Sequence, residues 1–146
     1  DARCEPKPVQ DHLPLLIGAK GPRMLGVVAR YADEWNMWSL PPELAVKRAE
    51  LDRACEANGR DPATIATSTQ ALFVVLESND EAQTWIDMLK GRPCVAGTPE
   101  RIAESVAAWR DAGVDEVIVP DFTLGSGAQR ADALDRIIEE VAPVFR

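Results

Sequence analysis

The sequence predicts an α/β fold in which about four parallel strands alternate with helices. Short apolar runs alternate with amphipathic stretches along the chain, and glycine- or proline-containing turns separate them. Such alternation is typical of a parallel sheet with right-handed crossovers. The length of 146 residues suffices for one core and is too short for two ordinary domains. We therefore expect a single domain spanning residues 1–146, which is either a small doubly wound sheet or half of a (β/α)8 barrel.

The first strand, turn and helix are expected between residues 15 and 31. The run Leu15–Ile17 is continuously apolar and is followed by Gly18, which favours a strand buried on both faces. Pro22 suits the first position of a helix, where a missing N–H costs nothing. The helix then shows one apolar face, formed by Met24, Leu25, Val28 and Ala29.

The middle of the chain repeats this pattern. Residues Ala32–Trp38 are expected to form the second strand. Pro41 and Pro42 open a longer helix that ends at Asn58–Gly59, a common C-terminal signal. Residues Ile65–Leu76 are expected to form the third strand, with its most apolar part at the end.

The last third contains helix starts, the final strand and the final helix. Ser78–Glu81 has the spacing of a capping box, and Thr98–Glu100 combines a cap, a proline and an acid. Glu116–Val119 is the clearest strand. After Gly125–Gly127 a last helix is expected to bury Leu134, Ile137, Ile138, Val141 and Phe145. The predicted order is therefore β-α-β-α-β-α-α-β-α.

Composition and charge restrict the classes of function. The net charge of −8 argues against a nucleic-acid partner, because phosphate backbones require a basic surface. The sequence has no apolar run of the roughly 18–20 residues that span a bilayer. Three widely spaced cysteines, Cys4, Cys55 and Cys94, form neither a disulfide framework nor a zinc motif. We expect a cytoplasmic protein without a metal site.

The best candidate site is the turn after the first strand, because ligands of both architectures collect at the C-terminal ends of strands. Gly18 and Gly21 allow close approach of a ligand, and the turn leads directly into a helix N-terminus, which attracts anions. Lys20 and Arg23 add positive charge. The turn is either an anion site or simply a tight βα connection, since neither the Rossmann nor the Walker pattern is present.

Other strand ends offer weaker candidates. Asn36 lies between Trp35 and Trp38 and either presents an amide beside an aromatic wall or belongs to the core. Asp121 follows the fourth strand, and Gly125–Gly127 is a second candidate anion loop. The single histidine, His12, precedes a strand and is interpreted as a surface residue. No catalytic constellation is recognisable, so the catalytic residues are unknown.

Several motifs in order resemble the luciferase-like monooxygenase superfamily. They are Pro14–Arg23, Ala29–Asn36, Gly97–Glu100 and Ala112–Glu116, together with the lead-in Pro6–Gln10. The resemblance covers nearly the whole chain and corresponds to the C-terminal half of the family's TIM barrel.

The resemblance implies a cofactor, either coenzyme F420 or FMN, and an enzyme that moves a hydride or activates oxygen on a small organic substrate. The family's cofactor phosphate is contacted by the turn that matches Gly18, Ala19, Lys20 and Gly21, continuing into Pro22 and Arg23. Asn36 matches a position near the cofactor, and Trp38 and Asp121 are expected to shape the substrate pocket. Residues 55–62 resemble the deazaflavin-dependent branch, which favours F420.

Two features depart from the family pattern. Ala19 and Lys20 replace residues that are often glycine, so the phosphate turn is expected to be tighter or partly charge-driven. The family is also about twice as long as this chain. A half-barrel would need to close its open edge with a second copy of itself or with an N-terminal half-barrel. The other hypothesis is a non-catalytic half-barrel that self-associates and binds an anion weakly.

Overall fold

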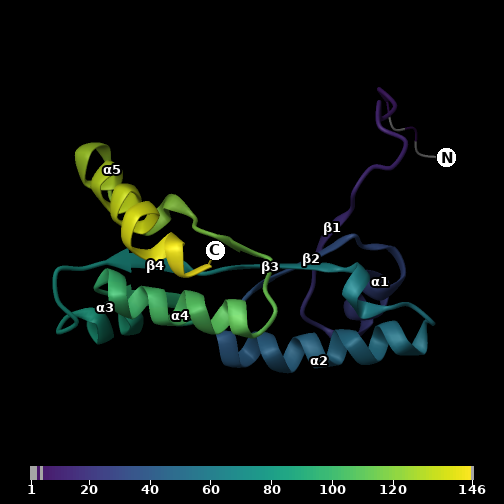
Figure 1. The fold of residues 1–146 in the computed structure, drawn as a ribbon, viewed down its shortest axis with the longest axis horizontal. Helices are drawn as coiled ribbons and strands as arrows, with labels where there is room; N and C mark the ends of the chain where they lie inside the picture. The colour runs from purple at the N-terminus through teal and green to yellow at the C-terminus, as the bar shows by residue number, and fades with distance from the viewer. Residues whose placement is uncertain (1–2, 4, 146) are drawn as a thin grey trace.

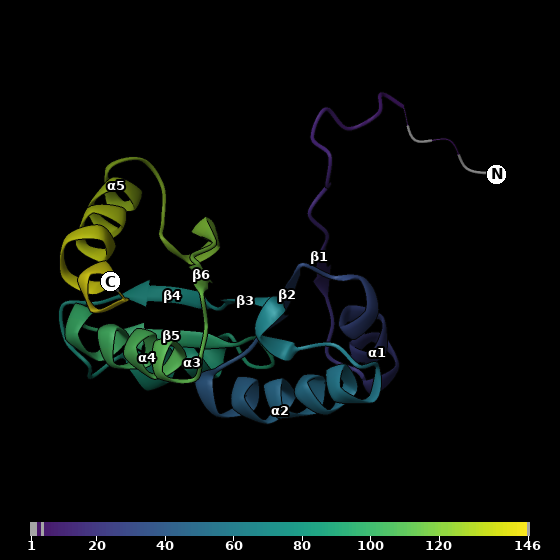
Figure 2. The ribbon, with the colours of Figure 1, turned by 45° about the vertical axis from the view of Figure 1, so that its right-hand side comes forward.

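The protein is described by a computed structural model covering residues 3 and 5–145; Cys4 lies outside the described residues. Figure 1 shows a central layer of strands with helices on two sides. The views in Figures 1 and 2 agree that helix α5 (Gly127–Arg136) lies on one side of this layer. Helices α2 (Pro41–Ala57), α3 (Ala82–Met88) and α4 (Pro99–Asp111) lie on the other side. The segment before the first strand extends away from the fold.

All paired strands are parallel, as the sequence predicts, but they form two sheets. The main sheet has the order β1-β2-β3-β6, and β4 pairs with β5 in a second sheet. The strands are β1 (Leu16–Gly18), β2 (Glu34–Trp38), β3 (Ala66–Gln70), β4 (Leu72–Val75), β5 (Cys94–Gly97) and β6 (Glu116–Ile118).

Three of the helices begin where proline occupies the first turn. Pro22 begins α1 (Pro22–Tyr31), and Pro41 and Pro99 begin α2 and α4. Glycines in the left-handed region follow α2 and α4, at Gly59 (φ 67°) and Gly113 (φ 81°). Helix α5 continues as a π-helical turn at 137–141 and a 3-10 turn at 142–145.

The third predicted strand is in fact two strands, and one strand was missed. The segment 65–76 pairs with β2 and β6 up to Gln70, and from Leu72 onward it pairs with β5. Gln70 accepts a hydrogen bond from the Ser39 amide, and the Leu72 amide then bonds to the Pro93 carbonyl at 2.8 Å. Residues two apart in a strand direct their backbone N–H and C=O groups to the same edge of the strand. β5 therefore pairs with the edge that β2 occupies earlier along the segment. β5 is not recognisable in the sequence, because four residues give little periodicity.

The prediction that the first strand is buried on both faces is wrong. β1 is an edge strand, and Leu15 and Leu16 are 44% and 54% exposed. Its only partner among the described residues is β2, since nothing covers its other edge. A continuous apolar run indicates burial in a complete barrel, which these residues alone do not form.

Two details of the later helices also differ from expectation. The capping box at Ser78–Glu81 does not form, because α3 begins only at Ala82 and no side chain caps it. In the last helix Ile137 and Val141 are buried, whereas Leu134 and Ile138 are 37% and 57% exposed. The π-helical turn accommodates more residues per turn, which rotates the apolar positions out of a single face.

Side-chain alternation along β2 separates the core from the candidate site. Trp35 and Met37 are buried against α1 and α2, in a cluster that also contains Leu25, Val28 and Leu51. Asn36 and Trp38 therefore point to the opposite face of the sheet. A larger cluster around Phe73, Ile102 and Trp109 joins α4, β4 and the C-terminal helical turns.

Candidate functional site

The turn between β1 and α1 is fixed by the neighbouring strand. The Ala19 amide donates to the carbonyl of Asn36 at 3.1 Å, and the indole Nε1 of Trp35 donates to the Ala19 carbonyl at 2.8 Å. Gly21 is the N-cap of α1, and its carbonyl accepts from the amides of Met24 and Leu25, both at 3.0 Å. Hydrogen bonds within the chain thus define the conformation of the turn.

The N–H groups of the turn that have no backbone acceptor lie later in the chain than the resemblance implies. The Ala19 amide is already bound within the sheet. The amides of Lys20, Gly21 and Arg23 donate to no backbone carbonyl among the described residues. These amides precede or begin a helix of ten residues, where the dipole favours a negative group. Pro22 contributes no donor, so the N–H groups of the turn without a backbone partner are those of Lys20, Gly21 and Arg23.

The charge of the turn is partly neutralised. The ammonium of Lys20 forms an ion pair with the carboxylate of Glu43, in the first turn of α2. Arg23 has no ion pair within the described part of the chain. The sequence does not identify Glu43 as a partner of Lys20, because Glu43 lies 23 residues later and only the packing of α2 against α1 brings the two together.

A cavity of about 810 Å³ opens beside this turn. It lies at the C-terminal ends of β1 and β2, which is where α/β proteins bind ligands. Its walls are Gly18, Ala19, Lys20, Asn36, Met37, Trp38, Leu40, Pro42, Glu43, Gly91, Arg92 and Pro93. The structure therefore brings together five of the predicted site residues: Gly18, Ala19, Lys20, Asn36 and Trp38.

The turn and the cavity fit a phosphate group. Neither Gly18 nor Gly21 has an atom within 4 Å of an added Cβ, so the space above the turn is open. The cavity volume is within the range of about 300–1,000 Å³ that accommodates small ligands. Three unused amides and one ammonium are the donor set that a phosphate requires. Gly21, Pro22 and Arg23 adjoin the cavity without lining it.

Asn36 is held by its neighbours on the same face of the sheet. Its Nδ2 donates to the Ser68 hydroxyl at 2.9 Å, and its Oδ1 accepts from Gln70 Nε2 at 3.4 Å. Ser68 is fully buried and Asn36 is 8% exposed. Ser68 and Gln70 were missed in the sequence, where the polar run Thr67–Gln70 inside a strand was the available signal. The three side chains form a polar ladder on the inner face of the sheet.

Asp121 does not belong to this cavity. It lies in the 3-10 turn η2 (Asp121–Thr123) after β6, where its carboxylate pairs with Arg130 at 2.8 Å. The loop Gly125–Gly127 lies near a second cavity of about 930 Å³, bounded by β4, α3, η2 and α5, which Gly125 lines. The Gly125 carbonyl accepts from Arg130 Nε at 3.2 Å. The structure therefore places Asp121 apart from Asn36 and Trp38.

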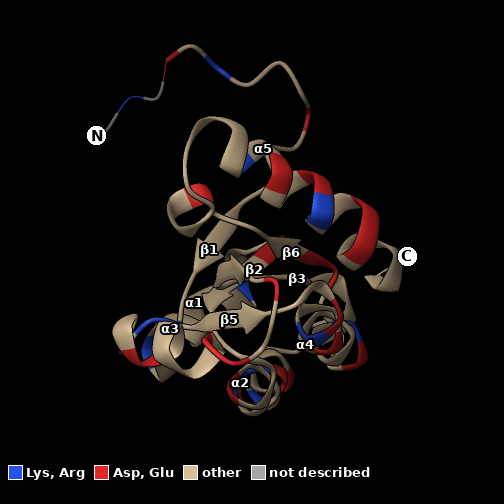
Figure 3. Ribbon diagram, turned by 90° about the vertical axis from the view of Figure 1, so that its left-hand side faces the viewer, with Lys and Arg blue, Asp and Glu red and all other residues tan. Residues whose placement is uncertain are grey.

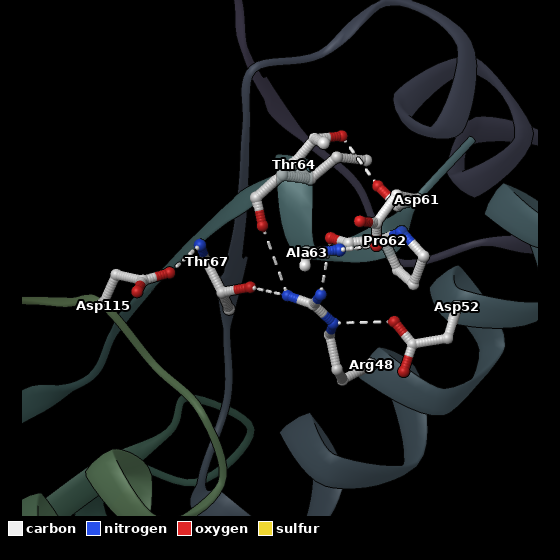
Figure 4. A network of polar contacts seen from close by, with 9 residues as sticks. Arg48, Asp52, Asp61, Pro62, Ala63, Thr64, Thr67 and Asp115 are labelled. Atoms are coloured by element: carbon white, nitrogen blue, oxygen red, sulfur yellow. Dashed lines mark hydrogen bonds and ion pairs between the residues drawn. The ribbon is translucent and has the colours of Figure 1, made fainter.

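The opposite end of the sheet carries a network that has a structural role (Figure 4). Arg48 of α2 bonds to Asp52 and to the Pro62 carbonyl, at 2.8 and 2.9 Å, and also to the Thr67 hydroxyl. The Thr67 amide donates to the Asp115 carboxylate at 2.8 Å. These contacts join α2, β3 and the start of β6 at the N-terminal ends of the strands, opposite the end at which barrel enzymes carry their active sites.

His12 also lies at this end, as predicted, and its Nε2 contacts Asp33 at 2.9 Å. The Asp33 carboxylate accepts the Leu15 amide at 2.7 Å. The Leu15 amide, followed by His12, lowers the pKa of Asp33. Burial raises the pKa of the thiols of Cys55 and Cys94, which keeps both protonated at neutral pH.

The surface is mixed in charge. Figure 3 shows Asp and Glu interspersed with Lys and Arg along the helices. Within residues 3 and 5–145 no group of three or more His, Cys, Asp or Glu is placed to hold a metal ion. Over the same residues, no helix has both the length and the apolarity to cross a membrane.

Comparison with known proteins gives both sequence and structural matches. Residues 1–91 match the family model described as luciferase-like monooxygenase. The phthiodiolone/phenolphthiodiolone dimycocerosates ketoreductase of Mycobacterium tuberculosis is 27% identical over 114 residues, covering 73% of this chain and 27% of that protein. The Mycobacterium kansasii protein of the same name is 28% identical over 113 residues, covering 73% and 28%. The chain spans between a quarter and a third of the length of these curated relatives.

Solved structures of low identity share the fold. The coenzyme F420-dependent tetrahydromethanopterin reductase of Methanopyrus kandleri is 20% identical with a TM-score of 0.69, covering 92% of this chain and 51% of that one. An F420-dependent secondary alcohol dehydrogenase is 16% identical with a TM-score of 0.71, covering 93% and 50%. A long-chain alkane monooxygenase is 15% identical with a TM-score of 0.67, covering 88% and 39%. The chain is thus a partial (β/α) barrel.

Proposed function

Because this chain belongs to the luciferase-like monooxygenase family, we propose that it holds the cofactor phosphate of an F420- or FMN-dependent oxidoreductase, with F420 favoured. The cavity at the ends of β1 and β2 carries this proposal, since it joins an anion-binding turn to Asn36 and Trp38. Residues 55–62 support F420 by their resemblance to the deazaflavin-dependent branch, and two structural neighbours are named as F420-dependent enzymes.

Several residues of the turn and of the cavity have a defined part in this proposal. The amides of Lys20, Gly21 and Arg23 and the Lys20 ammonium bind the phosphate. The ladder of Ser68, Asn36 and Gln70 offers polar groups beside it, and Trp38 forms an apolar wall. The bound cofactor would supply the hydride, or the electrons that activate oxygen, for reaction with a small organic substrate. The protein residues bind and orient, and no acid or base is assigned.

The proposed phosphate role is tested by binding of paired ligands. FMN and riboflavin differ by the phosphate alone, whereas F420 differs from its phosphate-free hydroxydeazariboflavin by the phosphodiester and the tail beyond it. Changing Lys20→Ala should weaken FMN and F420 about tenfold, the loss of one charge-assisted contact, and leave the phosphate-free ligands unchanged. Lys47→Ala is the matched control, because Lys47 also pairs with a glutamate but lies outside the cavity.

Titration by ligand fluorescence gives the dissociation constants, and circular dichroism confirms folding. If all four ligands respond equally to Lys20→Ala, the turn does not bind phosphate. If the 146-residue chain binds none of them, the proposed function is wrong and the non-catalytic half-barrel is the remaining hypothesis.

We also propose that the open edges of the main sheet are closed by another half-barrel. β1 and β6 each pair with one strand only among the described residues. Leu13, Leu15 and Leu16 beside β1 are 44–54% exposed, and an apolar edge of this kind favours strand pairing. The partner is a second copy of the chain or an N-terminal half of the same barrel. Light scattering of the chain alone should show a dimer or larger species, and a monomer at every concentration would contradict self-pairing.

A further inference from the structure

Glu43 is an unexpected neighbour for an anion site. It lines the cavity together with Lys20, and its side chain is 41% exposed. It lies in the first turn of α2, where the helix dipole stabilises a negative charge. The carboxylate holds the Lys20 ammonium through a direct ion pair. An anion that approaches Lys20 therefore also meets the field of Glu43, which opposes a second negative charge.

Arg92 supplies a cation from another wall of the same cavity. It lies between α3 and β5, and its amide donates to the Leu89 carbonyl at 3.0 Å. The adjacent Pro93 accepts from the Leu72 amide, which places this turn where β2 ends. The Arg92 guanidinium has no hydrogen bond or ion pair with any residue that the structure describes. Its charge is available to a ligand.

The charged side chains that line the cavity suit a ligand that carries one negative charge. Lys20 and Glu43 neutralise each other, and Arg92 remains. A phosphate monoester carries about −1.5 to −2 at neutral pH, because its second pKa is about 6, whereas a phosphodiester carries one charge. FMN ends in a monoester, and the phosphate of F420 is a diester.

We propose that Glu43 and Arg92 set the charge of the cavity so that it accepts a phosphodiester monoanion in preference to a phosphomonoester dianion. This inference rests on the proposed function, in which the cavity holds the cofactor phosphate. Arg92 compensates the single charge of the diester. Glu43 repels the additional charge of the monoester, so it acts as a specificity-determining residue between the two cofactors.

The test is a comparison of three variants with the four ligands used above and the methyl ester of FMN, at low ionic strength, where charge effects are least screened. Glu43→Gln should tighten FMN about tenfold and the methyl ester of FMN, a phosphodiester with the same ring, no more than about threefold, because the carboxylate acts most on the extra charge. Arg92→Gln should weaken the phosphate-bearing ligands by about five- to tenfold. Riboflavin and the hydroxydeazariboflavin should be unaffected. Glu50→Gln is the control, since Glu50 pairs with Lys47 outside the cavity.

The outcomes separate this inference from the proposed function. If the unmodified chain binds the phosphate-bearing ligands but Glu43→Gln changes FMN and its methyl ester by the same factor, the charge-selection role is overturned. The same conclusion follows if Arg92→Gln has no effect on either. If the unmodified chain binds none of the ligands, the proposed function and this inference both fail. A loss of the FMN effect in 0.5 M salt, with riboflavin unchanged, is expected and supports an electrostatic cause.

Discussion

A comparison of two buried tryptophans measures how much the hydrogen bond that fixes the turn contributes to the free energy of unfolding. Trp35 and Trp109 are both fully buried. Nε1 of Trp35 donates to the Ala19 carbonyl at 2.8 Å, whereas Nε1 of Trp109 has no hydrogen-bond partner among the described residues. The same substitution by phenylalanine removes a satisfied donor at one site and an unsatisfied one at the other. The contact of Trp109 with the Phe73 ring, at a centroid distance of 6.3 Å, keeps an aromatic partner in the variant.

The magnitude follows from the hydrogen bond alone, because the lost volume is the same in both variants. Trp35→Phe leaves the buried Ala19 carbonyl without its partner, which costs about 1–3 kcal/mol beyond the loss of packing. Trp109→Phe removes an unsatisfied donor and regains about 1–3 kcal/mol of desolvation. The free energy of unfolding should therefore fall further for Trp35→Phe, by about 2–6 kcal/mol relative to Trp109→Phe.

Urea unfolding followed by far-ultraviolet circular dichroism measures both variants without relying on tryptophan fluorescence. The m-values must agree for the difference to be one of stability. If Trp109→Phe destabilises the protein as much as Trp35→Phe does, the assignment of the two indole environments is wrong. Trp35→Phe should also weaken FMN relative to riboflavin, because the turn loses its anchor to β2.

Three further predictions concern the other end of the sheet and two glycines. Arg48→Met should lower the free energy of unfolding by about 1–3 kcal/mol, since it leaves the Thr67 hydroxyl without its donor and removes one of the two donors of the Pro62 carbonyl, which keeps the Ile65 amide, while the exposed Arg53→Met should have little effect in the same urea experiment. The pKa of Asp33 lies below its usual value of 3.8 in the folded state, so its stabilising contribution is present above pH about 4 and is lost as pH falls through the folded pKa. Asp33→Asn should therefore differ from the unmodified chain at pH 6 and converge with it near pH 2; a constant difference in unfolding midpoint would contradict this. Gly97→Ala should destabilise by more than about 1 kcal/mol, because φ is +145° and the new Cβ would lie 2.5 Å from Asn79 Oδ1, whereas Gly26→Ala inside α1 should stabilise by about 0.5–1 kcal/mol in thermal unfolding.

Local chemistry in the sequence predicted most of the elements and the turn beside which the cavity lies. Pro22, Pro41 and Pro99 determine the starts of three helices through their fixed φ and missing donor, and these constraints do not depend on the rest of the chain. Gly59 and Gly113 end two helices because only glycine adopts a left-handed conformation without cost. Pro22 likewise marks the end of the turn that begins at Gly18, because it fixes the first position of α1. The position of Asn36 beside it follows from strand alternation in neighbouring parallel strands.

The partners of these residues were decided only by tertiary packing. Glu43 reaches Lys20 because α2 packs against α1, and Arg92 reaches the cavity because β5 continues the edge that β2 leaves. Ser68 and Gln70 engage Asn36 through strand register, which no local pattern encodes. Asp121 lies apart because η2 turns it toward Arg130. The sequence by itself determined where the backbone turns, since φ preferences are local, and only the fold decided which charges meet at the turn, since electrostatic partners come from distant segments.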